Sequence, residues 1–109
     1  MHELGITRNI VAIVSERAGA MRVKRVALEI GKLSAIVPDA IRFCFDVCSQ
    51  GTPLEGAELD IREIAGRGRC LVCGEILELE KPFGKCACGS GQIQCIAGEE
   101  MKIKEMETF

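Results

Sequence analysis

Four of the seven cysteines in this 109-residue chain stand in two close pairs. Cys70 and Cys73 lie in "CLVCG", Cys86 and Cys88 lie in "CACGS", and a glycine that suits a tight turn follows each pair. The N-terminus does not resemble a secretory signal, so the thiols are expected to stay reduced and to bind metal or do redox chemistry. Four thiolates suit a closed tetrahedral zinc site. We therefore predict a structural Zn(II) site at these cysteines, ahead of a dithiol redox pair or an iron–sulfur centre.

The second cysteine pair is irregular, because its spacing is C-x-C instead of C-x-x-C. Its chelate loop is one residue tighter, and Cys95 in "QIQCI" is near enough in sequence to replace Cys86 or Cys88 as a ligand. We prefer Cys86 and Cys88, because the Gly-Ser that follows Cys88 resembles the turn after Cys73. Cys95 alternates with its neighbours like a strand residue, and its other interpretation is a small apolar side chain.

Cys44 and Cys48 have the i, i+4 spacing of a helix, which could also bind a metal. Both share a helical face with Ile41 and Phe45, and free cysteine is among the most buried residue types. We predict that these two cysteines pack in the core and bind no metal.

The N-terminus offers a second set of metal ligands around His2, the only histidine of the chain. Met1 is expected to keep a free amine, since methionine is normally removed only before small residues. An α-amine has a pKa of about 8 and an imidazole one of about 6.5, so both can give up a proton to a metal near neutral pH. The amine of Met1, the amide nitrogen and imidazole of His2, and the amide or carboxylate of Glu3 then form a planar site. Such a site suits Ni(II) or Cu(II) better than zinc, and its exposure favours release of the ion.

Five segments with helix or strand periodicity must position these ligands. Apolar residues over Thr7–Arg17 predict a helix that ends at Gly19, and Pro38 predicts the start of a second helix that runs to Ser49. Alternation predicts strands in "RVKRVALEIGKL", "AELDIREI" and "EMKIKEM". The predicted inward-facing residues are Ile6, Ile10, Ile13 and Val14 in the first helix, Ile41, Cys44, Phe45 and Cys48 in the second, and Val26, Leu28, Ile30, Leu59, Ile61, Met101 and Ile103 in the strands. Arg25, Ala27 and Glu29 are predicted to face outward.

Residues 66–98 differ in composition from the rest, because they hold five of the seven cysteines and few apolar residues. An insert of this kind needs a metal or a cross-link to fold. We therefore predict an α+β domain formed by residues 1–65 plus 99–109, interrupted by a zinc-binding module at 66–98.

Composition argues against several classes of function. The net charge is -2, the two signs are interspersed, and there is no Trp or Tyr and only four Phe, so no basic or aromatic surface for nucleic acid or a membrane is expected. No apolar run is long enough to span a bilayer, which favours a cytoplasmic protein. No base, nucleophile and orienting group can be assembled, so we do not expect an enzyme.

Several stretches resemble the HypA/HybF family of hydrogenase maturation proteins. They are "MHELGITRNI", "RVALEIGKLSAIVPDAIRFCFDV", "GTPLEGAELDI", "CLVCG", "CACGS" and "GEEMKIKEME", and together they cover nearly the whole chain in order. The resemblance implies a small sheet packed by two helices, which forms a nickel-binding domain, with an inserted zinc-ribbon-like module. It implies a nickel metallochaperone with Ni(II) at Met1, His2 and Glu3 and structural Zn(II) at Cys70, Cys73 and Cys88.

The same resemblance implies partners. They are a GTPase called HypB, the large subunit of [NiFe]-hydrogenase and, for some members, urease accessory proteins. The chain departs from the family at Cys86, since the family usually has C-x-x-C there, so the fourth zinc ligand remains open between Cys86 and Cys95. The alternative function is a zinc-ribbon adaptor that binds a protein or nucleic acid and carries no nickel. A further alternative is a thiol redox enzyme that uses Cys70 and Cys73.

Overall fold

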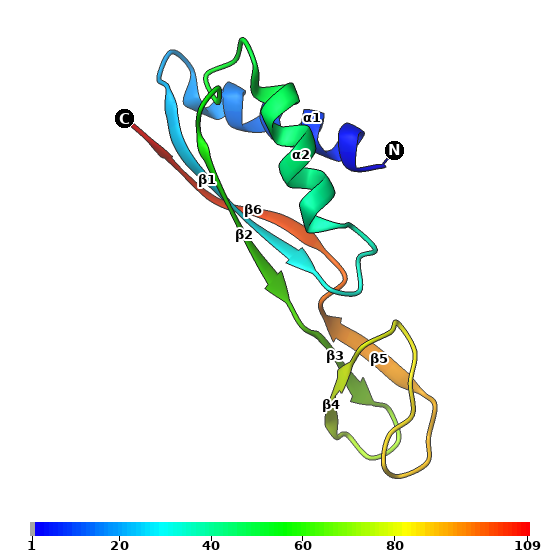
Figure 1. Cartoon of the computed structure of the whole chain (residues 1–109). Helices are drawn as coiled ribbons and strands as arrows, with labels where there is room; N and C mark the ends of the chain where they lie inside the picture. The colour runs from blue at the N-terminus through cyan, green and yellow to red at the C-terminus, as the bar shows by residue number, and fades with distance from the viewer. Residues whose placement is uncertain (1) are drawn as a thin grey trace. The chain divides into compact units, whose positions relative to one another are not determined.

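The computed structural model describes the chain from His2 to Phe109, except for the side chain of His2. It contains two helices and six strands (Figure 1). The bounds are α1 His2–Ala18, β1 Val23–Gly31, α2 Pro38–Ser49, β2 Glu58–Ile64, β3 Gly66–Cys70, β4 Ile76–Leu79, β5 Ile93–Ala97 and β6 Met101–Thr108. No helix of residues 2–109 is both long and apolar enough to cross a membrane. The α+β fold predicted from the sequence is confirmed.

The chain packs as two compact units. The helix unit consists of Ile36–Arg62, Lys102–Phe109 and the described part of Met1–Glu29. The cysteine unit consists of Ile30–Ala35 and Glu63–Met101. The predicted division into domains of residues 1–65 plus 99–109 and 66–98 concerns which parts fold independently, and it stays a prediction.

Helix α1 starts earlier than its apolar periodicity predicted and ends before Gly19, which has a φ of 61°. The hydroxyl of Thr7 donates to the carbonyl of Glu3 at 2.6 Å and is buried, which holds the first turn of the helix. The prediction for Ile13 was wrong, since its side chain is 45% exposed. At about 100° per residue, Ile13 lies well away from the centre of the buried face. That face is formed by Thr7, Ile10, Val11, Val14 and Ala18.

Helix α2 has the bounds that the sequence predicted. Pro38 occupies its first turn, where a missing N–H costs no helical hydrogen bond. Ile41 and Phe45 are buried, and α2 packs against α1. Cys44 and Cys48 are only half-buried, because they lie at the edge of this face instead of its centre.

The sheet of the helix unit has the strand order β2-β1-β6, and the two helices pack on one of its faces (Figure 1). Val26, Leu28 and Ile30 of β1 are buried, as predicted. Ala27 was predicted to face outward, but only 7% of it is exposed. Ala27 lies on the central strand of the sheet, so its methyl group has a strand on either side.

The other face of this sheet carries an ion cluster centred on Arg25. Its guanidinium donates to Asp60 of β2 at 2.6 Å and to Glu105 and Glu107 of β6 at 3.4 and 3.3 Å. The carboxylates, Asp60 first, raise the pKa of Arg25. Exposed pairs of this kind contribute little to stability, so the cluster mainly marks the solvent-facing side of the sheet.

The cysteine unit contains the sheet β4-β3-β5. Both neighbours run antiparallel to β3, with Gly68 opposite Leu77 of β4 and Cys95 of β5. At the base of the unit the backbone of residues 31–33 bonds to two other segments. The N–H of Lys32 donates to the carbonyl of Ile64 at 2.8 Å, and that of Leu33 to Gly98 at 2.8 Å. Gly66 and Gly98 allow this close approach, since a Cβ on Gly98 would lie 2.6 Å from the Cα of Gly66.

Candidate metal centre

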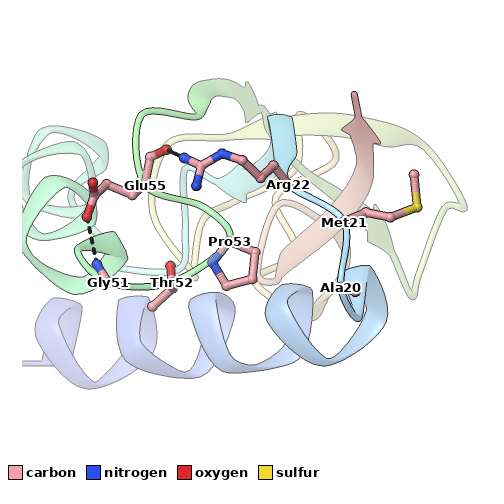
Figure 2. A pocket seen from close by; sticks show the side chains of 7 residues that line it. All are labelled: Ala20, Met21, Arg22, Gly51, Thr52, Pro53 and Glu55. Atoms are coloured by element: carbon pink, nitrogen blue, oxygen red, sulfur yellow. Dashed lines mark hydrogen bonds between the residues drawn. The ribbon is translucent and has the colours of Figure 1, made fainter.

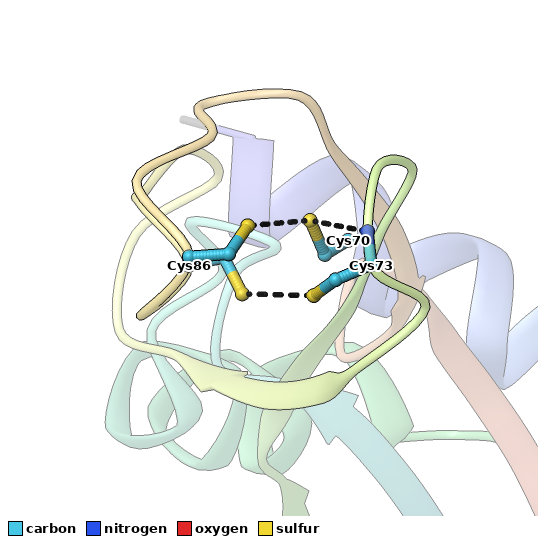
Figure 3. Close-up of side chains that lie close together, drawn as sticks. Cys70, Cys73 and Cys86 are labelled. Atoms are coloured by element: carbon cyan, nitrogen blue, oxygen red, sulfur yellow. Dashed lines mark hydrogen bonds between the residues drawn. The ribbon is translucent and has the colours of Figure 1, made fainter.

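The sulfurs of Cys70, Cys73, Cys86 and Cys88 converge in the cysteine unit. Figure 3 labels the first three of these cysteines. All four lie within 4.8 Å of one another, with 3.6 Å between Cys70 and Cys88 and 3.5 Å between Cys73 and Cys86. Tetrahedral zinc with Zn–S bonds of about 2.3 Å separates its sulfurs by about 3.8 Å. The cluster therefore fits a structural zinc ion.

Two tight turns hold the cluster, and we call them the long knuckle, Cys70–Glu75, and the short knuckle, Cys86–Ser90. In the long knuckle the N–H of Gly74 donates to the carbonyl of Cys70, and the N–H of Cys70 to the carbonyl of Glu75, both at 2.9 Å. The short knuckle repeats both bonds with one residue fewer. Gly89 donates to Cys86 and Cys86 to Ser90, again at 2.9 Å.

Glycine conformation explains why each knuckle closes after its second cysteine. Gly74 has a φ of 80° and Gly89 a φ of 94°, in the left-handed region that other residues rarely adopt. Each knuckle supplies one buried sulfur, Cys70 or Cys86, and one exposed cysteine, Cys73 or Cys88. In the sequence, the glycine that follows each cysteine pair was the feature that favoured Cys88 over Cys95 as a zinc ligand.

The thiols of the cluster differ in acidity in the absence of metal. The N–H of Cys73 donates to the sulfur of Cys70 at 3.5 Å and is the main reason that the pKa of Cys70 falls to about 6. The N–H of Glu75 lowers the pKa of Cys73, but the hydrogen bond with the Cys86 thiol and burial outweigh it and raise the pKa to about 12. One thiolate thus forms readily, and it is stabilised by the thiols around it.

The remaining cysteines lie elsewhere. Cys95 is half-buried in β5 and donates to the carbonyl of Ala97 at 3.3 Å, and burial raises its pKa. It does not belong to the cluster. Cys44 and Cys48 are on α2 and do not join it either.

Of the predicted nickel ligands, Met1 and the side chain of His2 lie outside the described residues. Glu3 lies in the first turn of α1, and its carboxylate accepts a hydrogen bond of 3.4 Å from the backbone N–H of Val37. Val37 is the N-cap of α2, and no side chain of its own caps that helix. Sequence reasoning missed this contact. The only sign of this contact in the sequence was that no Ser, Thr, Asp or Asn stands immediately before Pro38 to cap the helix.

A hollow of about 440 Å³ lies in the helix unit between the turn after α1 and the turn after α2 (Figure 2). Arg22 donates to the backbone carbonyl of Glu55 at 2.9 Å, and the Glu55 carboxylate accepts from the N–H of Gly51 at 2.7 Å. These groups bind one another across the hollow, and its lining contains no His or Cys. The hollow is therefore a poor metal site, and the cysteine cluster is the better candidate.

Known proteins resemble this chain over nearly its whole length. Residues 1–108 match the sequence model of the family described as "Hydrogenase/urease nickel incorporation, metallochaperone, hypA". A hydrogenase maturation factor HypA from Nostoc punctiforme is 67% identical over 107 residues, which are 98% of this chain and 95% of the relative. Its namesake from Geobacter metallireducens is 47% identical over 98% of both chains.

Solved structures share the fold. The solution structure of a HypA protein has a TM-score of 0.74 and 25% identity, and covers 100% of this chain and 97% of its own. The solution structure of the Ni metallochaperone HypA from Helicobacter pylori has a TM-score of 0.70 and 23% identity, with 97% of this chain and 96% of its own covered. The chain belongs to the HypA family of nickel metallochaperones for hydrogenase and urease.

Proposed function

We propose that this chain binds Ni(II) through the amine of Met1, the amide and imidazole of His2 and an auxiliary group of Glu3, and delivers it to [NiFe]-hydrogenase. The observation that carries the proposal is the family match from residue 1 onward. Urease is the second client that the family description names. A HypB-type GTPase and the hydrogenase large subunit are the proposed partners, and urease accessory proteins are proposed for the second client.

The first turn of α1 supports a nickel site at this place. Thr7 and Val37 both hold Glu3, so the residue next to His2 belongs to a packed helix instead of a frayed end. The first N–H groups of an α-helix have no acceptor within the helix. The amide of His2 can therefore bind a metal without breaking a helical hydrogen bond.

We propose that zinc is bound by Cys70, Cys73, Cys86 and Cys88 and has a structural role. Four thiolates leave no position for water or substrate, so this ion stabilises the cysteine unit and does no hydrolysis. When bound, zinc would supply the cross-link that the small core of this unit lacks.

Calorimetric titration of the untagged, zinc-loaded protein with Ni(II) tests the nickel site. We expect one nickel per wild-type chain and loss of that binding in His2→Ala. One extra residue before Met1 should abolish binding too, because it converts the amine into an amide. One extra residue after Phe109 is the matched control and should change nothing. Equal nickel binding by wild type and His2→Ala would overturn the proposal and favour the adaptor function.

A further inference from the structure

The two knuckles of the cysteine cluster differ in the backbone hydrogen bonds that reach their first sulfur. In the long knuckle the N–H of Cys73 donates to the sulfur of Cys70 at 3.5 Å. The residue in the same place in the short knuckle is Cys88, since each stands directly before a turn glycine. The spacing is one residue shorter there, and no backbone N–H of the described chain donates to the sulfur of Cys86.

The backbone turns of the two knuckles are matched. Gly74 and Gly89 donate to the carbonyls of Cys70 and Cys86 at the same 2.9 Å. The short knuckle, with one residue fewer, therefore keeps the backbone turn but lacks the backbone hydrogen bond to its first sulfur. Access to solvent is matched as well, because each knuckle has one buried and one exposed cysteine.

An N–H bond to a ligating sulfur stabilises its negative charge and orients it. Loss of such an outer partner typically lowers metal affinity by about 10- to 100-fold. From these bonds we infer that the short knuckle releases zinc more readily than the long knuckle. Cys86 and Cys88 leave the ion before Cys70 and Cys73 do. This inference rests on the proposed zinc site and assigns an order to its ligands.

The order of release can be read in the wild-type protein. Zinc-loaded chain is treated with a substoichiometric amount of the chelator 4-(2-pyridylazo)resorcinol together with iodoacetamide, and the alkylated peptides are identified by mass spectrometry. We expect label on Cys86 and Cys88 before Cys70 and Cys73. Label that reaches both knuckles together, or the long knuckle first, would overturn the inference.

Two length variants test the cause. One alanine inserted between Ala87 and Cys88 restores the C-x-x-C spacing, and we expect zinc transfer to the chelator to slow by about tenfold. Deletion of Val72 shortens the long knuckle, and we expect faster transfer and loss of the labelling order. One alanine inserted between Lys81 and Pro82, in an exposed loop, is the control and should transfer zinc at the wild-type rate.

Zinc content separates the possible failures. One zinc per wild-type chain with no order of labelling would leave the proposed zinc site intact and remove only this inference. A purified wild-type chain that holds no zinc would remove the zinc site itself. The wild-type labelling decides the matter even where a length variant does not fold.

Discussion

The acidity of the cluster thiols determines how zinc loading depends on pH. At pH 7 Cys70, with a pKa of about 6, is largely a thiolate, whereas Cys73, with a pKa of about 12, is a thiol. Cys88 is a thiol too: the N–H of Ser90 lowers its pKa, but the hydrogen bond with the Cys70 sulfur and burial outweigh this and raise it. Zinc must displace a proton from each thiol that is still protonated. Zinc binding at pH 7 therefore releases at least two protons, from Cys73 and Cys88.

We accordingly expect zinc affinity to rise by about 100-fold or more per pH unit between pH 7 and 8. Below about pH 6 the dependence should steepen, because Cys70 then binds a proton as well. Competition with a chelator across this range, and calorimetry in two buffers of different ionisation enthalpy, measure the slope. Cys95→Ser is the control, since Cys95 lies outside the cluster. A pH dependence of zinc affinity that corresponds to the release of one proton or fewer would contradict these pKa values.

The base of the cysteine unit, where the backbone of residues 31–33 bonds to two other segments, depends on glycine. A Cβ on Gly31, the last residue of β1, would lie 2.1 Å from the carbonyl oxygen of Gly98. Gly31→Ala must push these backbones apart and disturb the 2.9 Å bond from Gly31 to Glu100. We expect a loss of roughly 3 kcal/mol or more in the free energy of unfolding, measured by urea titration of the zinc-loaded chain.

The matched glycine substitution lies in α1. A Cβ on Gly5 meets nothing within 4 Å, and alanine favours a helix interior over glycine by about 1 kcal/mol. Gly5→Ala should therefore stabilise the chain slightly. Similar losses for Gly31→Ala and Gly5→Ala would show that the close approach at Gly31 does not limit stability.

Sequence periodicity predicted some elements better than others, for physical reasons. The bounds of α2 were correct because Pro38 marks its start and its apolar residues recur at helical spacing. The start of α1 was missed because its first turn is held by Thr7 and Val37, which are contacts and not a cap motif. Strand β3 was not predicted, since its inward-facing residues Gly66 and Gly68 are glycines that make room for Leu79. The alternation of Gly and Arg in "GRGRC" was the available signal.

The buried apolar residues are divided unevenly between the two units. Those of the cysteine unit are few, namely Ile30, Cys70, Leu79 and Cys86, and two of them are cluster cysteines. The helix unit buries Ile10, Val11, Val14, Ala18, Val23, Val26, Ala27, Leu28, Ile41, Phe45 and Leu54. A small apolar core needs a metal to stay folded, whereas a larger one does not. The two units should therefore respond differently to loss of zinc.

Removal of zinc by a chelator tests this difference and, with it, the predicted division into two domains. We expect the amides of β3, β4 and β5 to lose protection from hydrogen exchange, because the cross-link between their turns is gone. Amides of α1 and of β1 up to Glu29 should keep their protection, because their core contains no metal ligand. Hydrogen exchange measured by mass spectrometry with and without zinc gives the protection of both sets of amides in one experiment. Chelator saturated with zinc is the control and should leave every segment protected. Simultaneous loss of protection in α1 would mean that the chain unfolds as one cooperative body, and the division into separate domains would be wrong.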